Sequence, residues 1–346
     1  MAHRFWRNLQ YVVLFTILGA VLGVLVAYSQ VGQTAAAREW IRDGATDGLL
    51  IGLLVASYVF FFERWLLKSF LRRFQFVALV AYNSVAYVVL IFIGRTIGRF
   101  VTGTYDDAAS ILEDRWLFDS LLWAFVAVVP VNFVLKIIDL IGARELARFL
   151  SGRYHQPRVE RRVFCFMDLV GSTGIAERIG DILYLAFVDQ FLHDITEAVL
   201  ASRGEVHKYV GDEVILSWPA RRIESVPAPL IFLKDVRLRL LQEESNYRER
   251  FDALPEFRAG LHIGEVVAGE MGDLRKEIVY LGDLMNTTAR LVEACKEAGS
   301  NVVISDELLS RLSLPPGMSA RPLGSLALRG RQSELVLHAL SLSETG

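Results

Sequence analysis

The chain has 346 residues, of which 53% are hydrophobic and 22% are charged, and its formal net charge is -2 at pH 7. Its mean hydropathy of +0.36 is too high for an ordinary soluble protein of this length. The net charge favours no charged partner, and no nucleic-acid partner is expected. The two cysteines, Cys165 and Cys295, lack metal-ligand spacing, so we expect small buried thiols instead of a zinc site.

The apolar residues are concentrated in four stretches of the N-terminal part, each about the 20 residues that a membrane-crossing helix needs. These stretches lie near residues 9–28, 47–67, 77–97 and 118–141. A buried core helix is the alternative for any single stretch, but four in succession favour membrane spans. Residues 1–141 are therefore predicted to form a membrane domain of four transmembrane helices in contact with the lipid bilayer.

Lysine and arginine residues predict the orientation of these spans. They are frequent at the N-terminus, in the second connection and after the fourth span: Arg4, Arg7, Arg64, Lys68, Arg72, Arg73, Arg144, Arg148, Arg153, Arg158, Arg161 and Arg162. The first and third connections carry fewer: Arg38, Arg42, Arg95, Arg99 and Arg115. The positive-inside rule then predicts a multi-pass protein of the inner cell membrane with both termini in the cytoplasm and no cleaved signal peptide.

Few polar features stand out inside the predicted spans. Gly19 with Gly23 and Gly48 with Gly52 form two G-x-x-x-G patterns, which allow close helix contact but are common in membrane helices. Lys136 lies near the cytoplasmic end of the fourth span, where its ammonium can snorkel toward water. So few ionisable residues do not predict a transport path.

Residues 142–161 form a basic connection that starts with helical periodicity and is stopped by Gly152 and Pro157. The connection could transmit a membrane or periplasmic signal, or it could be a solvated linker. The sequence favours neither interpretation.

Residues 162–346 alternate between strand and helix patterns. A buried strand is predicted over 163–167, followed by a helix whose apolar face runs from Ile175 to Val199. Residues 205–210 and 214–218 then read as a hairpin. A strand, a helix and a second strand in one sheet make a right-handed crossover with parallel strands.

That crossover places two aspartates at the same edge of the sheet, because Asp168 follows the first strand and Asp212 lies in the hairpin turn. Mg²⁺ prefers a few carboxylates together with substrate phosphates. The pair therefore predicts a site for divalent cations that hold a triphosphate. Either aspartate alone would be read as a turn or helix cap.

The next segment is rich in glycine. Residues 260–273 read as a second hairpin, and a strand and a turn at Gly282 come before a helix with Asn286 and Arg290 on one face. An amide beside a guanidinium suits a ribose and a phosphate. An exposed helix could also carry both side chains without any function.

Four motifs in this order resemble class III nucleotidyl cyclases, and among them bacterial membrane adenylate cyclases. The motifs are FCFMDLVGST (164–173), HKYVGDEVI (207–215), GLHIGEVVAGEMG (260–272) and YLGDLMNTTARL (280–291). The segments FLSGRYH (149–155) and LRGRQSELVLHAL (328–340) are similar to the same group. The resemblance covers about residues 142–340 and leaves the membrane domain unexplained.

The resemblance implies a ferredoxin-like α/β catalytic domain that works as a head-to-tail homodimer, with each active site built from both chains. Asp168 and Asp212 match the family's metal-binding pair, which holds two Mg²⁺ or Mn²⁺ ions. Lys208 matches the lysine that hydrogen-bonds adenine. Asn286 matches the asparagine that orients the ribose, and Arg290 the arginine that stabilises charge on the phosphates.

One position departs from the family pattern. The second base-reading residue is usually Asp, Thr or Ser, but Val279 stands there. Valine cannot accept a hydrogen bond from the adenine amino group, so selectivity for ATP is expected to depend mainly on Lys208. Catalysis is not expected to suffer, because the metals and Arg290 do not depend on this position.

These observations predict a membrane adenylate cyclase that converts ATP to 3′,5′-cyclic AMP and pyrophosphate. A guanylate cyclase is the nearest alternative, although family members of that kind usually carry Glu at the position of Lys208. A catalytically silent nucleotide-binding sensor is the alternative from another class of protein.

Overall fold

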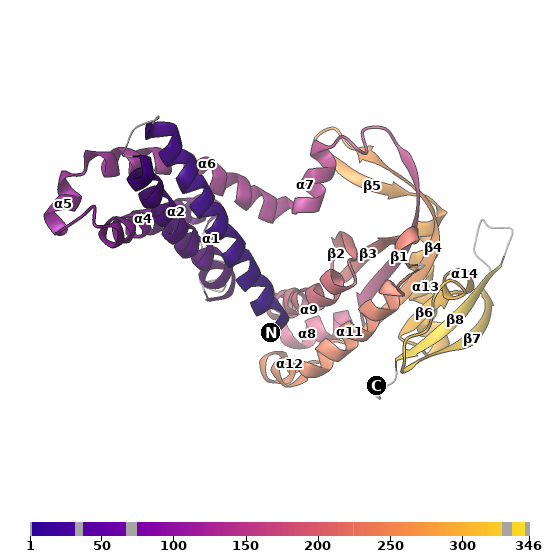
Figure 1. The fold of residues 1–346 in the computed structure, drawn as a ribbon. Helices are drawn as coiled ribbons and strands as arrows, with labels where there is room; N and C mark the ends of the chain where they lie inside the picture. Colours follow the sequence, from indigo (N-terminus) through magenta and orange to yellow (C-terminus); the bar gives the residue numbers. More distant parts are fainter. Residues whose placement is uncertain (1, 32–36, 67–74, 224, 327–333, 343–346) are drawn as a thin grey trace. The chain divides into compact units, whose positions relative to one another are not determined.

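The computed structural model describes residues 2–31, 37–66, 75–223, 225–326 and 334–342. The chain divides into two compact units, Met1–Leu150 and Ser151–Gly346 (Figure 1), and the boundary falls inside the predicted connection 142–161. Lys68, Arg72 and Arg73, which were used to predict the orientation, and residues 328–333 of the last motif lie outside the described residues.

The described part of the first unit is helical. Its elements are α1 (Ala2–Val31), α2 (Ala37–Ser57), the π-helix η1 (Tyr58–Leu66), α4 (Phe76–Thr102), α5 (Ala108–Glu113), α6 (Arg115–Ile141) and α7 (Ala143–Leu150). Four segments are long and apolar enough to cross a membrane: Asn8–Tyr28, Glu39–Glu63, Phe76–Thr102 and Asp119–Ile138. The four predicted apolar helices are confirmed, and the second begins and ends earlier than its sequence pattern suggested.

Helices α1 and α2 pack backbone against backbone at the predicted glycine pairs. A Cβ atom added at Gly19 or Gly23 would overlap a carbonyl oxygen of α2, and one added at Gly52 would lie 2.9 Å from the carbonyl oxygen of Phe15. Only glycine allows this approach, as in small-residue contacts between membrane helices. Patterns of this kind are common in membrane helices, but here they mark a close contact between α1 and α2.

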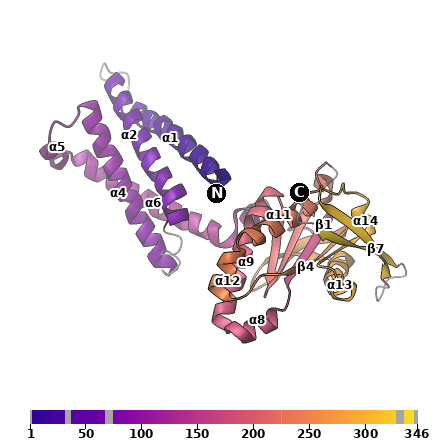
Figure 2. The ribbon, with the colours of Figure 1, turned by 90° about the horizontal axis from the view of Figure 1, so that it is seen from below.

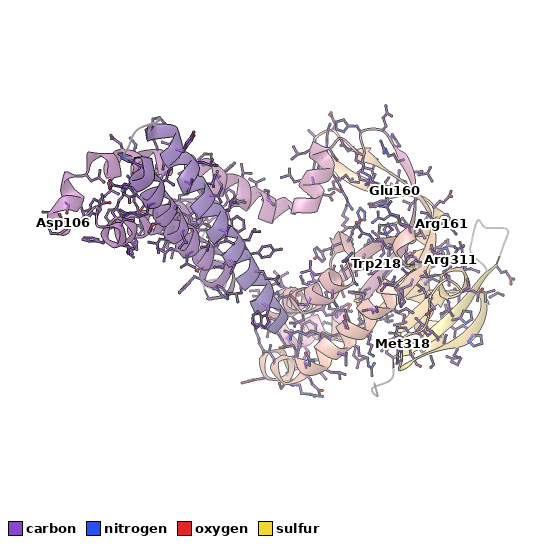
Figure 3. All side chains as sticks on the ribbon, viewed as in Figure 1. Asp106, Glu160, Arg161, Trp218, Arg311 and Met318 are labelled. Carbon is purple, nitrogen blue, oxygen red and sulfur yellow. The ribbon has the colours of Figure 1, made fainter. Side chains whose placement is uncertain are left out.

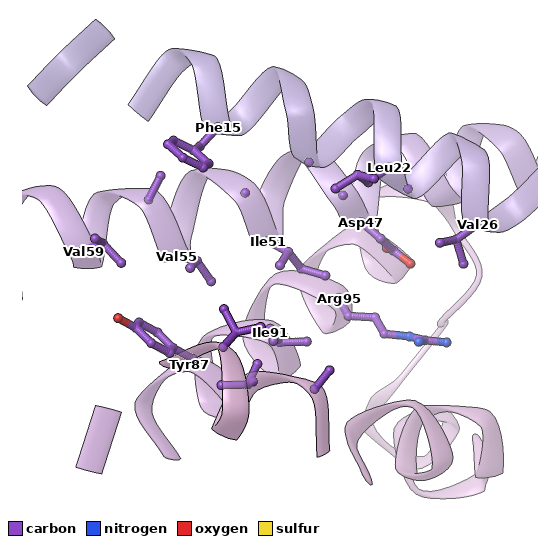
Figure 4. A pocket seen from close by; sticks show the side chains of 18 of the residues that line it. Phe15, Leu22, Val26, Asp47, Ile51, Val55, Val59, Tyr87, Ile91 and Arg95 are labelled. Carbon is purple, nitrogen blue, oxygen red and sulfur yellow. The ribbon is translucent and has the colours of Figure 1, made fainter. Parts of the chain in front are cut away.

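A cavity of about 1230 Å³ lies among α1, α2, α4 and α6 (Figure 4). Phe15, Ile51 and Ile91 contribute to its apolar wall, whereas Asp47 and Arg95 approach each other at one end of the view. The interior of this apolar unit therefore contains ionisable groups.

Lys136 does not snorkel as predicted, because its Nζ forms an ion pair with Glu63, which is buried. Asn83 Nδ2 donates to Glu63 Oε1 and Tyr87 Oη donates to Glu63 Oε2, each over 3.0 Å. An ionised group in an apolar environment is costly unless it is paired in this way. A partner on another helix thus keeps Lys136 inside the unit.

The second unit is built on one mixed sheet. Its strands are β1 (Arg158–Leu169), β2 (Glu205–Val210), β3 (Glu213–Pro219), β4 (Phe257–Met271), β5 (Glu277–Leu281), β6 (Val302–Ser305), β7 (Met318–Leu326) and β8 (Leu335–Leu342). Its helices are α8 (Ser172–Ile179), α9 (Asp181–Ala201), α10 (Ala220–Ile223), α11 (Ala228–Gln242), α12 (Glu244–Phe251), α13 (Asp283–Ala298) and α14 (Asp306–Leu309).

The strand order is β2-β3-β1-β4-β6-β8-β7, with β5 paired to β4. Strand β3 is antiparallel to both β1 and β2, so β1 and β2 are parallel to each other, with β3 between them. The elements β1, α9, β2, β3, α11 and β4 form the βαββαβ arrangement of a ferredoxin-like fold. The predicted fold and the predicted parallel crossover are both confirmed.

Each face of the sheet has its own cover, since successive side chains of a strand point to opposite faces. Val163, Cys165 and Met167 of β1 join the core that includes α9 and α11, while α13 lies on the other face (Figures 1 and 2). Trp218 of β3 lies within this core, with its ring 5.6 Å from that of Phe232 (Figure 3).

Helix α13 lies very close to the sheet. A Cβ atom at Gly260 of β4 would be 2.8 Å from Leu291 Cβ and from the carbonyl oxygen of Thr288. Strand β5 also lies against this face, where the Tyr280 ring meets Phe164 at 5.4 Å. Gly260, the first residue of the third motif, therefore lets α13 approach the sheet.

Two local predictions were wrong. The helix expected from Ile175 to Val199 is interrupted at Gly180, whose φ of 82° lies in a region that favours glycine, and so it divides into α8 and α9. Residues 260–273 do not fold as a hairpin, because Phe257–Met271 is a single strand. The chain turns after Gly272 (φ 104°) and pairs back through β5.

Candidate active site

Asp168 and Asp212 come together at the end of β1. Met167 is opposite Val214 of β3, so Asp168 is one residue beyond this pair and Asp212 is in the turn just before β3. Gly211 (φ 64°) supplies the backbone conformation that the turn needs. The predicted meeting of the two carboxylates is confirmed by the sheet register.

The electrostatics of this pair are those of carboxylates placed close together with little compensating charge. Burial, followed by the negative charge of Asp212, raises the pKa of Asp168 above its ordinary value, although Arg258 acts in the opposite direction. Burial and then the charges of both aspartates also raise the pKa of Glu213. Asp212 Oδ2 is buried and has no hydrogen-bond partner. A divalent cation between the two carboxylates would relieve all three effects.

The donor set suits a hard cation that keeps other ligands. In the described part of the chain, no group of three or more His, Cys, Asp or Glu side chains forms a complete metal cage. Mg²⁺ is commonly bound by one or two carboxylates and completes its octahedral shell with water and phosphate oxygens. The residues present therefore fit a metal that arrives with a phosphorylated substrate.

The sequence did not point to Tyr184, in the first turn of α9. Burial and then the charge of Asp212 raise the pKa of Tyr184 to about 12. Its position relative to Asp212 depends on the break at Gly180, which begins α9 in a new direction. Recognising that glycine as a helix boundary was the available signal.

Lys208 of β2 lies beside the strand that carries Val279. Its Nζ is 3.4 Å from Oε2 of Glu277, two residues before Val279 on β5. The neighbouring His207 and Tyr280 rings lie 4.8 Å apart, which also joins β2 to β5. The structure therefore brings together the two predicted base-reading positions, and it adds Glu277, which the sequence analysis missed.

Asn286 and Arg290 follow β5 directly on α13, which begins after Gly282. Asn286 is exposed and Arg290 is partly buried, whereas Thr287, Thr288 and Leu291 face the sheet. The predicted helix and the one-turn spacing of the two polar residues are confirmed. Their amide and guanidinium groups can bind sugar hydroxyls and phosphate oxygens.

The two cysteines are buried, as predicted. Burial raises the pKa of the Cys295 thiol to about 11. A thiol that stays protonated at neutral pH is neither a nucleophile nor a metal ligand. Cys295 is therefore not a candidate nucleophile or metal ligand.

Residues 155–341 match the family model described as the adenylate and guanylate cyclase catalytic domain. Adenylate cyclase 2 of Rhizobium meliloti (strain 1021) is 35% identical over 189 residues, which cover 55% of this chain and 52% of that protein. Adenylate cyclase of Anabaena cylindrica is 24% identical over 182 residues, which cover 51% of this chain and 36% of that protein. The chain thus spans about half or less of the length of these curated relatives.

The structure of a bacterial light-regulated adenylyl cyclase shares the fold, with a TM-score of 0.50 and 19% sequence identity. The likeness covers 62% of this chain and 65% of that chain. The family match begins after Leu150, so the four apolar helices lie outside it.

Proposed function

Because the chain belongs to the family of adenylate and guanylate cyclase catalytic domains, we propose that it is a membrane-anchored adenylate cyclase that converts ATP to 3′,5′-cyclic AMP and pyrophosphate. The observation that carries this proposal is the carboxylate pair at one sheet edge, where burial and the charge of Asp212 raise the pKa of Asp168 and the buried Asp212 Oδ2 has no hydrogen-bond partner. The names of the relatives from Rhizobium and Anabaena support adenine over guanine.

In the proposed reaction, the ribose 3′ oxygen attacks the α-phosphorus of ATP and pyrophosphate leaves. Asp168 and Asp212 would hold two Mg²⁺ or Mn²⁺ ions, which supply Lewis-acid charge that lowers the pKa of the 3′ hydroxyl. Arg290 donates hydrogen bonds to the phosphate oxygens as charge develops on them. The proton of the 3′ hydroxyl passes to a phosphate oxygen of the substrate or to water, since no side chain is assigned as the base.

The remaining predicted residues position the nucleoside. Lys208 donates a hydrogen bond to N1 of adenine, which guanine cannot accept because its N1 carries a hydrogen. Asn286 orients the ribose so that its 3′ oxygen lies in line with the leaving pyrophosphate. This alignment accounts for a rate enhancement without a covalent intermediate.

We further propose that the active enzyme is a head-to-tail homodimer. The carboxylate pair of one copy would face Lys208, Asn286 and Arg290 of the second copy, as the family resemblance implies. Membrane anchoring supports this arrangement, because two tethered copies meet at a high effective concentration.

The proposed domain roles follow the predicted boundaries. Residues 1–141 anchor the chain in the inner membrane and receive a membrane or periplasmic signal. Residues 142–161 connect this domain to residues 162–346, which catalyse the reaction. Both termini then face the cytoplasm, where ATP is available. The four apolar helices support anchoring.

A guanylate cyclase is the second candidate, and the observation that favours it is Val279, which lacks an acceptor for the adenine amino group. A cyclase assay on the full chain in membranes, with ATP or GTP and with Mg²⁺ or Mn²⁺, distinguishes the two. We expect cyclic AMP from ATP as the main product. Mainly cyclic GMP would favour the second candidate, and no product with either would indicate a silent nucleotide-binding sensor.

The same assay tests the site. We expect Asp168→Ala to lower cyclic AMP synthesis by at least about 100-fold, a loss of the size expected when charge stabilisation of the transition state is removed. Glu249→Ala is the control, because Glu249 is an exposed acid on α12. Full activity of Asp168→Ala would contradict the assignment.

A further inference from the structure

Glu277 is an acidic residue that the proposed mechanism has not used. It stands at the start of β5, and its Oε2 is 3.4 Å from Nζ of Lys208, the residue assigned to adenine. The Glu277 side chain is 37% exposed and that of Lys208 is 54% exposed, so both groups are open to a ligand. A carboxylate therefore lies where the base is to be recognised.

The strand geometry places Glu277 on the same face of β5 as Val279. The two residues are opposite Met271 and Gly269 of β4, respectively. Residues two apart on a strand share a face and are separated by about 7 Å. The ion pair with Lys208 shows that the Glu277 side chain, which is longer than that of Val279, reaches from its strand position to the base-reading lysine.

The hydrogen-bonding groups of this cluster are complementary to adenine. Along the edge that is read, adenine presents an acceptor at N1 and a donor at its 6-amino group. The Lys208 ammonium only donates, and the ionised Glu277 carboxylate only accepts. Val279 can do neither.

Glu277 also has acceptor capacity left. Its Oε1 forms an ion pair with Nε of Arg275 over 3.2 Å, and its Oε2 faces Lys208. An ionised carboxylate has about four lone-pair positions, so two partners do not saturate it. A third donor, such as an amino group of a base, can still bind.

We propose that Glu277 is the specificity-determining residue that accepts the hydrogen bond of the adenine 6-amino group in place of Val279. This inference rests on the proposed adenylate cyclase function and deepens it. In the same orientation, guanine would place its N1 hydrogen against the Lys208 ammonium and its O6 against the Glu277 carboxylate. The pair therefore selects for adenine by attraction and against guanine by repulsion.

The test compares the kcat/KM values for ATP and GTP of the full chain in nanodiscs with those of Glu277→Ala. We expect Glu277→Ala to lower kcat/KM for ATP about 10-fold, the usual size for one hydrogen bond to a charged group. The value for GTP should stay constant or rise, because a repulsive contact to O6 is removed.

A rescue variant separates recognition from folding. Val279→Asp adds an acceptor at the position that the family usually uses, so Glu277→Ala/Val279→Asp should recover most of the lost selectivity for ATP. Glu244→Ala is the matched control, because Glu244 is also a half-exposed acid paired to an arginine, Arg248, over 2.8 Å. The control should leave both kcat/KM values unchanged.

The proposal is overturned if Glu277→Ala leaves the ratio of the two kcat/KM values within about twofold, or lowers both together so that Val279→Asp cannot restore the ratio. The second result would mean that Glu277 only supports the local structure. A wild-type chain that makes no cyclic nucleotide would instead overturn the proposed function. In that case, competition of ATP and GTP against a fluorescent ATP analogue, measured with the same variants, still decides the role of Glu277.

Discussion

In the first unit, Glu63 has a lysine, an asparagine and a tyrosine around its carboxylate, whereas in the second unit Asp168 has a further carboxylate as its neighbour. Asp43 shows the same pairing as Glu63, since Arg99 Nη1 lies 3.0 Å from its Oδ2. Both arrangements remove carboxylates from water, which is costly unless the charge is compensated. The first unit compensates within the chain, whereas Asp168 has the like charge of Asp212 beside it.

The contrast offers a way to distinguish acids that stabilise the fold from acids that can bind a ligand. A buried acid with a complete set of donors stabilises the fold and has little left to bind. Two acids that raise each other's cost of ionisation favour folding less but attract a cation strongly.

The largest expected effect is the loss of activity in Asp212→Asn without a loss of stability. Replacing one charge of the pair removes repulsion and metal affinity together, so cyclic AMP synthesis should fall at least about 100-fold. The thermal unfolding midpoint without metal should stay equal or rise. Parallel activity assays and thermal melts measure both, and a large drop in the midpoint would show that Asp212 is a structural acid.

The opposite result is expected for Lys136→Met in the first unit. It leaves the buried Glu63 without its cation, which typically costs about 3–5 kcal/mol of stability. Thermal unfolding in nanodiscs measures the loss, and the double variant Glu63→Gln/Lys136→Met should recover most of it. An unchanged midpoint for the single variant would mean that Glu63 does not depend on Lys136.

A bound metal ion should supply to Asp168 and Asp212 the compensating positive charge that Lys136 supplies to Glu63. Saturating Mg²⁺ is expected to raise the thermal midpoint of the wild type, because ligand at about 100 times its Kd stabilises by about 2.7 kcal/mol. The stabilisation should be absent in Asp212→Asn. Equal shifts in the two proteins would place the bound metal elsewhere.

The smallest effect is expected at Glu160 of the second unit. Like Glu63 in the first unit, this carboxylate has a cationic side chain and a tyrosine as partners. Burial tends to raise its pKa, but hydrogen bonds from Arg162 and Tyr154 outweigh burial and lower it below the ordinary 4.5. Its stabilisation is thus fully present above pH 4.5 and is lost as the pH falls through the lower folded-state pKa. Glu160→Gln should flatten the stability curve in this acid range, and an unchanged curve would contradict the pairing.

The sequence predicted the features that depend on regular patterns. The geometry of a parallel crossover predicted that Asp168 and Asp212 lie at the same sheet edge. The length of the apolar stretches predicted the four long helices. Features that depend on tertiary contacts were missed. Glu63 and Lys136 are on different helices, so only packing could reveal their pairing.

Glycines caused two opposite errors, a turn predicted inside a strand and a continuous helix predicted across a break. Both arose because a glycine backbone fits several conformations. Gly260, Gly264 and Gly269 read as part of a hairpin but lie in one long strand, where Gly260 makes room for α13. Gly180 read as a helical residue but ends α8. Glu277 became visible only when folding placed β5 beside Lys208.

The glycine contact between α1 and α2 has a consequence for anyone who rebuilds this chain. With no side chains between the two backbones, neither helix can be exchanged for a generic apolar segment, because a Cβ at Gly19 or Gly23 already collides. Helices α1 and α2 therefore form one packing unit, and an exchange has to include both. A chimaera that joins a different set of helices to the second unit therefore has to replace α1 and α2 together.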